Sequence, residues 1–339
     1  MDFFSNLNLG CAVNKVLTTE GMLFDIFVLL ATAIFFFVFK RKVKYPLAHF
    51  GIILSGVLIF EMFTSPMWDN PHLGAFAYFY KDVSWILSLG WSVMMLSALW
   101  IADLIAPKAK ELARFGVGLV VMTIAGIIAE SVVLALGLRA YAPEVHAALS
   151  GIMVANVPLE ALYYIPVFSV LIMGFYKYWS FILDGRPAVP IKKGRFVRNF
   201  LIVALSVFFF ELMIEPMVEN RLLPEWSYIY RDISILLTGF WVLLVFVAEA
   251  LVERFFAAHS LPDRFVMTLL AIAVVATPIE GWLIGHGFRV YGESATRDFV
   301  GISMPFSGVP IEVVFAIPLY FALILGLSKF VQLCLDNKR

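Results

Sequence analysis

Six glutamates occupy matching places in the two halves of this chain, inside or beside long apolar runs: Glu61, Glu130, Glu160, Glu211, Glu280 and Glu312. Glu61 and Glu211 lie about one helical turn from the end of their runs. An ionised, unpaired carboxylate is costly at membrane depth, so each of these groups is expected to be neutral, paired or beside water. A neutral carboxylic acid can serve as a general acid. The alternative is a structural hydrogen bond or ion pair to Arg139 or Arg289.

The element Pro-[Leu or Ile]-Glu occurs three times, at 158–160, 278–280 and 310–312. At 158 and 310 a helix start explains it, because proline loses no hydrogen bond in a first turn and the helix dipole favours glutamate there. Pro278 instead lies inside an apolar run, where it frees a backbone carbonyl and predicts a kink beside Glu280.

Aromatic and basic side chains surround these carboxylates and complete the set that could bind a substrate. Ring faces can shield a cation, although tyrosine and tryptophan also form an interfacial belt in many membrane proteins. Both interpretations stay open for Trp68, Tyr78, Tyr80, Trp226, Tyr228 and Tyr230, and we add to the candidate set Arg139, Tyr141, Arg289 and Tyr291.

Two charged pairs, Lys81-Asp82 and Arg231-Asp232, each stand directly before an apolar run. Aspartate readily accepts hydrogen bonds from the free N–H groups at a helix start. We therefore predict that Asp82 and Asp232 are the N-terminal caps of the helices that follow.

The elements that position these residues are membrane helices. Hydrophobic residues make up 62% of the chain and charged residues 15%, with a mean hydropathy of +0.91. Apolar runs long enough to cross a bilayer recur along the chain, and they are continuous, as in helices, rather than alternating, as in the strands of a barrel. We predict nine transmembrane helices in an all-α polytopic protein, at 20–39, 46–65, 83–105, 115–137, 157–176, 197–214, 233–252, 264–286 and 308–331. The first run is too long for a cleavable signal and has no cleavage site behind it.

The placement of basic residues predicts the orientation. Lys40, Arg41, Lys42 and Lys44 follow the first run, which places that loop in the cytoplasm by the positive-inside rule. With nine spans the N-terminus is then outside and the C-terminus inside. All but seven of the 25 lysines and arginines fall on the inner side; the seven are Lys15, Lys81, Arg139, Arg221, Arg231, Arg289 and Arg297. Cys11 and Cys334 are expected on opposite sides, so no disulfide is predicted.

Self-comparison indicates a tandem duplication with an offset of 150 residues. FEMFTSPMWDN (60–70) lies on FELMIEPMVEN (210–220), and VPLEALYYIP (157–166) lies on VPIEVVFAIP (309–318) after a two-residue insertion. Each half has an even number of spans, so the repeats are predicted to be parallel. The predicted divisions are an N-terminal segment with the extra helix (1–45), two four-helix repeats (46–180 and 197–332), a basic linker (181–196) and a tail (333–339). Because the shared polar residues surround the outer connections, we expect a site at the outer leaflet between the repeats.

Several classes of function lack the motifs that they require. The five histidines show no metal-ligand spacing, and the sequence contains no nucleophile elbow, P-loop, dinucleotide-binding glycine fingerprint or Asp-rich pyrophosphate motif. We therefore expect no metal and no cofactor.

The segments GLRAY (137–141), GIMVANVPLEALYYIPVFSVLI (151–172), GFRVYG (287–292) and GVPIEVVFAIPLYFALIL (308–325) resemble two families of membrane carotenoid enzymes. One is the lycopene cyclase domain of the small, heterodimeric or tandem type, with its Pro-x-Glu-Glu signature. The other is the carotenoid 1,2-hydratase family, which ELMIEPMVENRLLPEWSYIY (211–230) also resembles. The resemblance covers about half of the chain in short pieces. The second glutamate of the cyclase signature is replaced here by Ala161, Gly281 or Val313.

This resemblance implies that an acid protonates a terminal double bond of a linear isoprenoid, followed by cyclisation or hydration. On that hypothesis the proton donor is Glu61, Glu211, Glu130 or Glu280, while Glu160 and Glu312 position the donor or stabilise the cation. The substrate would be lipophilic and reach the enzyme from the bilayer, which would be a bacterial inner membrane, and no nucleic acid would be bound. Two alternatives from other classes stay open: a proton-coupled transporter, whose acids should lie near the midplane, and a non-catalytic lipid-binding or assembly protein.

Overall fold

A computed structural model describes residues 15–154, 157–188 and 195–336 of the chain. Cys11, six residues of the predicted linker and the last three residues of the predicted tail lie outside this part. Within it, nine helices are long and apolar enough to cross a membrane. They are α1 (Thr19–Phe39), α2 (Pro46–Thr64), α3 (Trp85–Ile105), α4 (Glu111–Ala135), α6 (Leu159–Leu183), α7 (Phe196–Ile214), α8 (Ile235–Phe255), α9 (Leu261–Gly285) and α11 (Ile311–Asp336). The chain is thus a multi-pass, mostly helical protein with membrane-spanning character.

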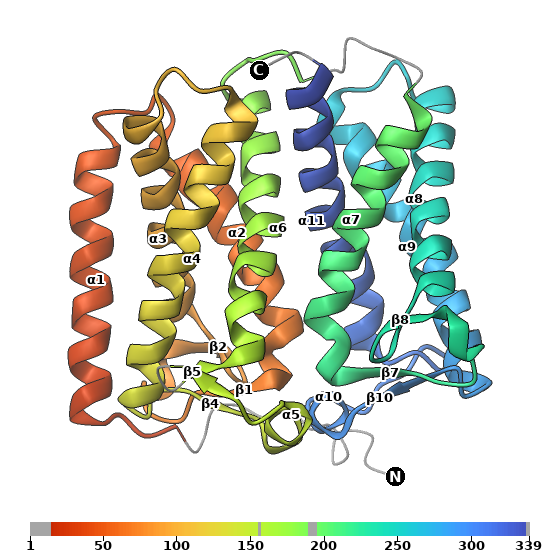
Figure 1. Ribbon diagram of the computed structural model, residues 1–339, viewed down its shortest axis with the longest axis horizontal. Coiled ribbons are helices and arrows are strands. Elements are labelled where there is room, and N and C mark those ends of the chain that lie inside the picture. Colours follow the sequence, from red (N-terminus) through yellow and green to blue (C-terminus); the bar gives the residue numbers. More distant parts are fainter. Residues whose placement is uncertain (1–14, 155–156, 189–194, 337–339) are drawn as a thin grey trace.

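The helices stand side by side, with α6 and α11 at the centre of the bundle and α1 at one edge against α3 (Figure 1). Two glycines let the central pair approach closely. A Cβ on Gly174 would lie 3.0 Å from the Cα of Leu327, and a Cβ on Gly326 would lie 2.7 Å from the Cα of Phe175. Small residues at such crossings allow extensive van der Waals contact between membrane helices.

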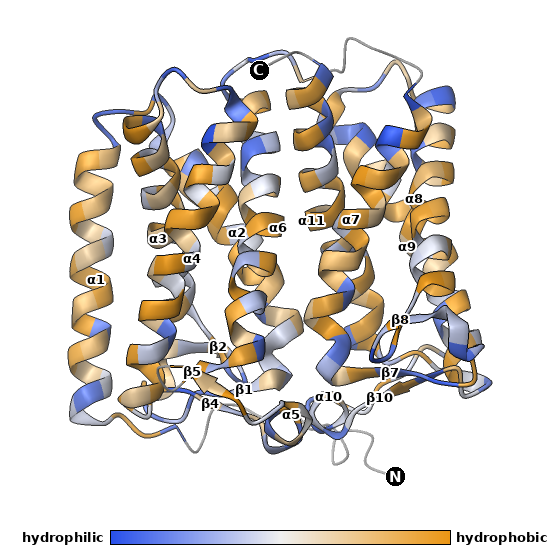
Figure 2. Cartoon of the chain, in the orientation of Figure 1, coloured by the Kyte–Doolittle hydropathy of each residue, from blue (hydrophilic) through white to orange (hydrophobic). Residues whose placement is uncertain are grey.

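Two ends of the bundle differ in structure. At the end that carries the loops 65–84, 136–158, 215–234 and 286–310, short strands and the helices α5 (Pro143–Ala148) and α10 (Glu293–Arg297) close the bundle, and we refer to it as the capped end. The opposite end, where the C-terminal helix finishes, we refer to as the basic end. Coloured by hydropathy, the long helices are apolar over most of their length and polar chiefly toward both ends (Figure 2).

The capped end contains β structure that the all-helical prediction did not include. Five two-stranded antiparallel sheets occur in the described residues. They pair β1 (Trp68–Asp69) with β4 (Ala140–Tyr141), β7 (Val218–Asn220) with β10 (Arg289–Tyr291), β2 (Tyr78–Tyr80) with β3 (Val83–Ser84), β8 (Tyr228–Tyr230) with β9 (Ile233–Ser234), and β5 (Met153–Val154) with β6 (Val157–Pro158). These loops are partly buried, with Met67, Leu73 and Ala77 fully enclosed. Buried backbone groups need partners, and the short ladders supply them.

The same contacts fix the first connection of each half. The Asn70 side chain donates to the carbonyl of Asp82 at 3.0 Å, and Asn220 donates to the carbonyl of Asp232 at 2.7 Å. The hydroxyl groups of Tyr78 and Tyr228 donate to the carbonyls of the same two asparagines. Each connection is therefore folded back on itself in the same way.

The prediction that Asp82 and Asp232 cap helices was wrong. Ser84 and Ser234 are the N-caps, because each hydroxyl accepts from a backbone N–H in the first turn of α3 or α8. Asp82 instead accepts from the backbone N–H of Asn70 at 2.6 Å and pairs with Lys15. An aspartate two residues before the cap lies too far back to reach the helix start, and here it secures the preceding loop.

Candidate functional site

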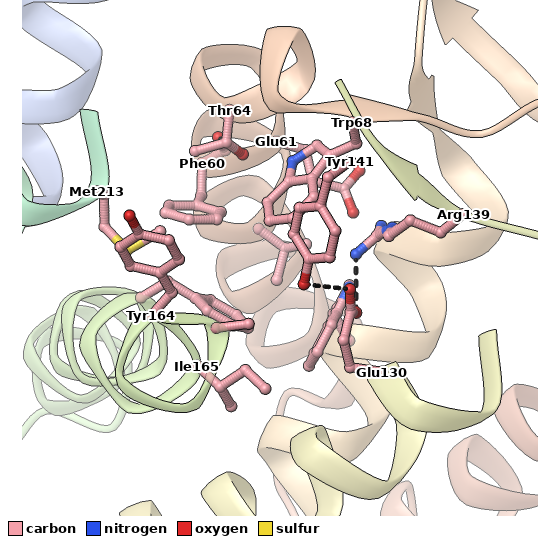
Figure 3. A pocket seen from close by; sticks show the side chains of 14 residues that line it. Phe60, Glu61, Thr64, Trp68, Glu130, Arg139, Tyr141, Tyr164, Ile165 and Met213 are labelled. Carbon is pink, nitrogen blue, oxygen red and sulfur yellow. Dashed lines mark hydrogen bonds and ion pairs between the residues drawn. The ribbon is translucent and has the colours of Figure 1, made fainter. Parts of the chain in front are cut away.

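In the first half, Glu130 and Arg139 form a buried ion pair at the capped end. Arg139 Nη1 lies 3.1 Å from Glu130 Oε2, and Tyr141 donates its hydroxyl to Glu130 Oε1 at 3.3 Å (Figure 3). Arg139 also donates through Nε to the Asn70 side chain at 3.1 Å. The guanidinium lies over the ring of Trp68, 4.9 Å from its centroid. Late α4 thus supplies a carboxylate that is already paired with residues of the segment 139–141, which leads into β4.

The second half repeats this cluster with equivalent residues. Arg289 Nη1 lies 3.3 Å from Glu280 Oε2, and Tyr291 donates to Glu280 Oε1 at 2.6 Å. Arg289 Nε donates to the side chain of Asn220 at 3.2 Å. Pro278 lies inside α9, two residues before Glu280. Arg289 lies over Trp241 instead, 5.9 Å from the ring centroid.

The two tyrosines of these clusters remain phenols. Burial, and then the neighbouring Glu130 carboxylate, raise the pKa of Tyr141 above its ordinary value of 10.0. Burial and Glu280 raise the pKa of Tyr291 in the same way. Each hydroxyl therefore keeps its proton and can donate it in a hydrogen bond to the carboxylate.

Glu61 and Glu211 contact hydroxyl groups rather than arginine. Ser88 Oγ lies 2.6 Å from Glu61 Oε2 and 2.8 Å from the carbonyl of Ser84. In the second half Thr238 makes the same pair of contacts, to Glu211 and to the carbonyl of Ser234. A hydroxyl has one proton and a carbonyl can only accept. One O–H can reach both acceptors only as a shared, weaker hydrogen bond, whereas a protonated carboxyl group that donates to the hydroxyl oxygen gives each contact a proton of its own.

Charge balance agrees with this assignment. Each half places two glutamates near one arginine, because Glu61 and Arg139 line one small cavity and Glu211 and Arg289 line another. That arginine is already within ion-pair distance of Glu130 or Glu280. One neutral carboxylic acid in each half leaves the buried group without net charge, which is the less costly state in a membrane interior.

Glu160 and Glu312, at the start of α6 and α11, hold loops and differ in their further partners. Glu160 Oε1 accepts from the backbone N–H of Ser150 at 2.6 Å and lies 3.5 Å from Arg231 Nη2. Glu312 Oε1 accepts from the backbone N–H of Val300. The Oε2 atoms of both glutamates are buried with no hydrogen-bond partner, and only Glu312 lines the large cavity described below. Glu312 therefore presents one unused carboxylate oxygen.

A cavity of about 390 Å³ lies between the halves at the capped end. Glu280, Arg289 and Tyr291 line it, Glu312 lines it from the start of α11, and Met62 and Phe63 line it from α2 of the first half. The remaining wall is largely apolar and aromatic, including Phe210, Phe299 and Tyr320. This volume falls within the range of small-molecule sites.

The cavity reaches the lipid-facing surface of the bundle. Met62 and Phe315 line it and are 53% and 65% exposed. Both residues belong to membrane-spanning helices. A lipophilic molecule could therefore enter sideways from the bilayer without crossing water.

Glu211 lies beside this cavity. It lines a small neighbouring cavity of about 10 Å³. Ile214, Val218 and Arg289 line both cavities. The carboxyl group thus adjoins the larger cavity without lining it.

The equivalent space in the first half is almost filled. Its cavity measures about 40 Å³, enough for little more than one water molecule. Glu61, Glu130 and Arg139 line it, and Trp68 and Tyr164 project into the same region (Figure 3). Glu130 and Arg139 also line a separate apolar groove of about 750 Å³ between α1, α3 and α4.

The remaining aromatic candidates divide by position. Tyr80 lines the large cavity, whereas Trp226 is 71% exposed and lies at the surface of the capped end. Tyr230 contacts Tyr163 across the two halves, with 2.9 Å between the hydroxyl oxygens. Tyr78 and Tyr228 fix the loops described above.

Sequence reasoning missed several residues of the site. Asn70 and Asn220 orient the arginines, Ser88 and Thr238 contact the acids, and Tyr320 lines the cavity. The asparagines could have been found, because both end the matching segments FEMFTSPMWDN and FELMIEPMVEN. Ser88 and Thr238 also lie 150 residues apart, but hydroxyl residues in apolar helices commonly bond to their own backbone.

Comparisons of the chain with family models, curated proteins and solved structures find no match. Among the described residues, no group of three or more His, Cys, Asp or Glu side chains could hold a metal ion. The function therefore has to be argued from the geometry of the capped end.

Proposed function

We propose that this chain is a membrane enzyme that protonates a terminal double bond of a linear isoprenoid, and that cyclisation or hydration follows. The observation that carries the proposal is the cavity between the halves, which opens toward lipid and ends at buried carboxyl groups. The resemblance of 137–172 and 287–325 to carotenoid end-group enzymes supplies the substrate class.

The hydrogen bonds and ion pairs of the three acids beside the cavity suggest a different catalytic role for each. Glu211 is the proton donor, because its contact with Thr238 favours a neutral carboxyl group and because it lies beside the cavity. Glu280 is a fixed carboxylate, since Arg289 and Tyr291 hold it. Glu312 offers an unpaired oxygen at the cavity wall and can receive a proton at the end of the reaction.

The reaction needs no redox step. The Glu211 proton adds to the less substituted carbon of the double bond, which leaves a tertiary carbocation and a carboxylate. An internal double bond captures the cation and a carbon-bound proton leaves to a carboxylate, giving a ring; alternatively water adds and loses a proton, giving an alcohol. The stacked rings of Phe210 and Tyr320, with centroids 4.2 Å apart, line the cavity and can stabilise the cation.

We also propose how the two halves are arranged in the membrane. The two halves are parallel four-helix repeats, supported by the recurrence of the Glu–Arg–Tyr–Asn cluster at equivalent positions. The basic residues of the loops support a bacterial inner membrane with the basic end in the cytoplasm and the capped end outside. Reporter fusions to the loops at 106–110 and 70–76 would report opposite sides, and the same side for both would contradict this orientation.

The function is tested by producing the protein in a host that accumulates lycopene and analysing the pigments by chromatography and mass spectrometry. Cyclisation leaves the pigment mass unchanged and alters its absorption, whereas hydration adds the mass of water. Unaltered pigment in membranes that contain folded protein would exclude lycopene as the substrate. Shorter linear isoprenoids supplied to the purified enzyme then test the broader class.

A proton-coupled transporter is the second candidate, favoured by paired, partly buried charges at the basic end. Lys329 Nζ lies 2.8 Å from Glu249 Oε1 and lines a cavity of about 70 Å³. That cavity shares no lining residue with the one at the capped end. Proton-coupled uptake by proteoliposomes would favour transport over catalysis.

A further inference from the structure

We infer that, of the two equivalent spaces at the capped end, only the 390 Å³ cavity beside Glu280 and Arg289 binds a ligand, because Trp68 and Tyr164 fill the equivalent space in the first half. The inference rests on the proposed function only for the class of ligand, a linear isoprenoid chain. Two positions in each half decide whether a ligand fits. They are occupied by Trp68 and Tyr164 in the first half and by Val218 and Ala316 in the second.

The first pair of positions is matched by strand register. Trp68 in β1 pairs with Tyr141 in β4, and Val218 in β7 pairs with Tyr291 in β10. Trp68 and Val218 therefore occupy the same place relative to the tyrosine that bonds the buried glutamate. The indole lies against Arg139 and occupies space that the smaller valine leaves open.

The second pair is matched along the helix. Tyr164 and Ala316 both lie six residues after the proline that precedes α6 or α11. Tyr164 is 2% exposed and lines the 40 Å³ cavity. Ala316 lines the 390 Å³ cavity. A methyl group in place of a phenol ring leaves room between α11 and the neighbouring half.

The carboxylates show the same asymmetry. Glu160 has Arg231 as an ionic partner, at 3.5 Å. The residue equivalent to Arg231 is Lys81, which pairs with Asp298 rather than with Glu312. Each carboxylate keeps an Oε2 atom without a hydrogen-bond partner, so the two differ in the ionic partner of Glu160. The first-half space is thus filled by side chains and flanked by a carboxylate with an ionic partner, whereas the second-half space is open.

Photolabelling with a farnesol analogue that carries a diazirine tests this inference in the full-length protein in detergent. We expect labelled peptides from 295–320 and from 62–66, which line the same cavity, and no labelling of 157–168, which lines only the filled space. Val218→Trp and Ala316→Tyr, separately and combined, should abolish labelling in the second half. Trp68→Val combined with Tyr164→Ala should add labelling in the first half and leave the second half labelled.

Thermal unfolding of each variant checks that it is folded, and the single substitutions serve where the double variant is unstable. Labelling of 157–168 in the wild-type protein, or undiminished labelling of folded Ala316→Tyr, would overturn the inference. Photolabelling depends on binding and not on catalysis. If the protein is labelled as expected but leaves isoprenoids unchanged, the binding site is supported and the proposed reaction is refuted.

Discussion

Lys81 Nζ, in the first half, lies 3.6 Å from Asp298 Oδ1, in the second half, and also donates to the backbone carbonyl of Asp298. The equivalent basic residue, Arg231, makes the opposite crossing and lies 3.5 Å from Glu160. Lys81 and Arg231 both have left-handed backbone conformations, with φ of 44° and 42°. The charged turns that occur twice in the sequence therefore tie each half to the other at the capped end.

Replacing Lys81 with methionine should destabilise the protein by up to about 3 kcal/mol, because the partly buried Asp298 carboxylate loses its counter-charge. The measurement is thermal or denaturant unfolding in detergent. Lys108→Met is the matched control, since Lys108 is exposed in the loop between α3 and α4. Equal effects of the two substitutions would show that the crossing contributes nothing.

Asp298 should also make stability depend on pH. Burial raises its pKa above the ordinary value of 3.8, against the opposing effects of Lys81 and Arg297. The folded protein then holds this proton to a higher pH than the unfolded chain does. The associated stabilisation is complete below pH 3.8 and is lost as the pH rises through the raised pKa. As the pH rises through this range, the melting temperature of Asp298→Asn should therefore fall less steeply than that of the wild-type protein. Parallel plots of melting temperature against pH for the two proteins would contradict this prediction.

The central crossing of α6 and α11 should not tolerate a side chain. Gly326→Leu brings its Cβ to 2.7 Å from a backbone atom of Phe175, so the helices must separate. We expect the free energy of unfolding to fall by about 1–3 kcal/mol, the usual cost of overpacking. Gly116→Leu in α4 is the control, because nothing lies within 4 Å of the Cβ position there. A folded Gly326→Leu protein with an unchanged melting temperature would contradict this packing.

Much of this architecture could be predicted because its causes are local. A span needs a run of apolar residues, so all nine predicted helices begin within four residues of those observed. The grouping of Glu130 with Arg139 and of Glu280 with Arg289 at one end follows from the same periodicity and topology.

The unpredicted parts depend on tertiary contacts. Nothing in the residues 81–84 distinguishes Asp82 from Ser84 as a cap until the direction of the loop is known. The difference in volume between the two cavities arises from side chains that meet only after folding, such as Trp68 and Tyr164. The assignment of one protonated acid per half likewise required the hydroxyl positions of Ser88 and Thr238.

A double substitution should show that the stability contributions of Glu280 and Arg289 depend on each other. Arg289→Met leaves a buried carboxylate without a counter-charge and should cost about 3–5 kcal/mol. Adding Glu280→Leu removes that charge and should restore part of the loss, measured as melting temperature in detergent. A double variant less stable than Arg289→Met alone would show that Glu280 does not depend on the arginine.

The last prediction separates the acids by role. Glu211→Gln keeps the size of the side chain and can still donate a hydrogen bond to Thr238, but it has no acidic proton. We expect a stable protein that no longer converts the isoprenoid to product. Glu280→Gln should instead lower stability, because Arg289 then lies buried without its carboxylate.

Glu61→Gln and Glu225→Gln complete the comparison. Glu61 makes the same hydroxyl contact as Glu211 but lies in the half whose cavity is filled, and Glu225 is exposed at the capped end. Product formation should therefore survive both substitutions. If Glu61→Gln abolishes activity while Glu211→Gln retains it, the reacting acid is in the first half. If all three variants remain active, the acid chemistry must come from another group, and Glu312, with its unpaired oxygen at the cavity wall, would be the residue to replace next.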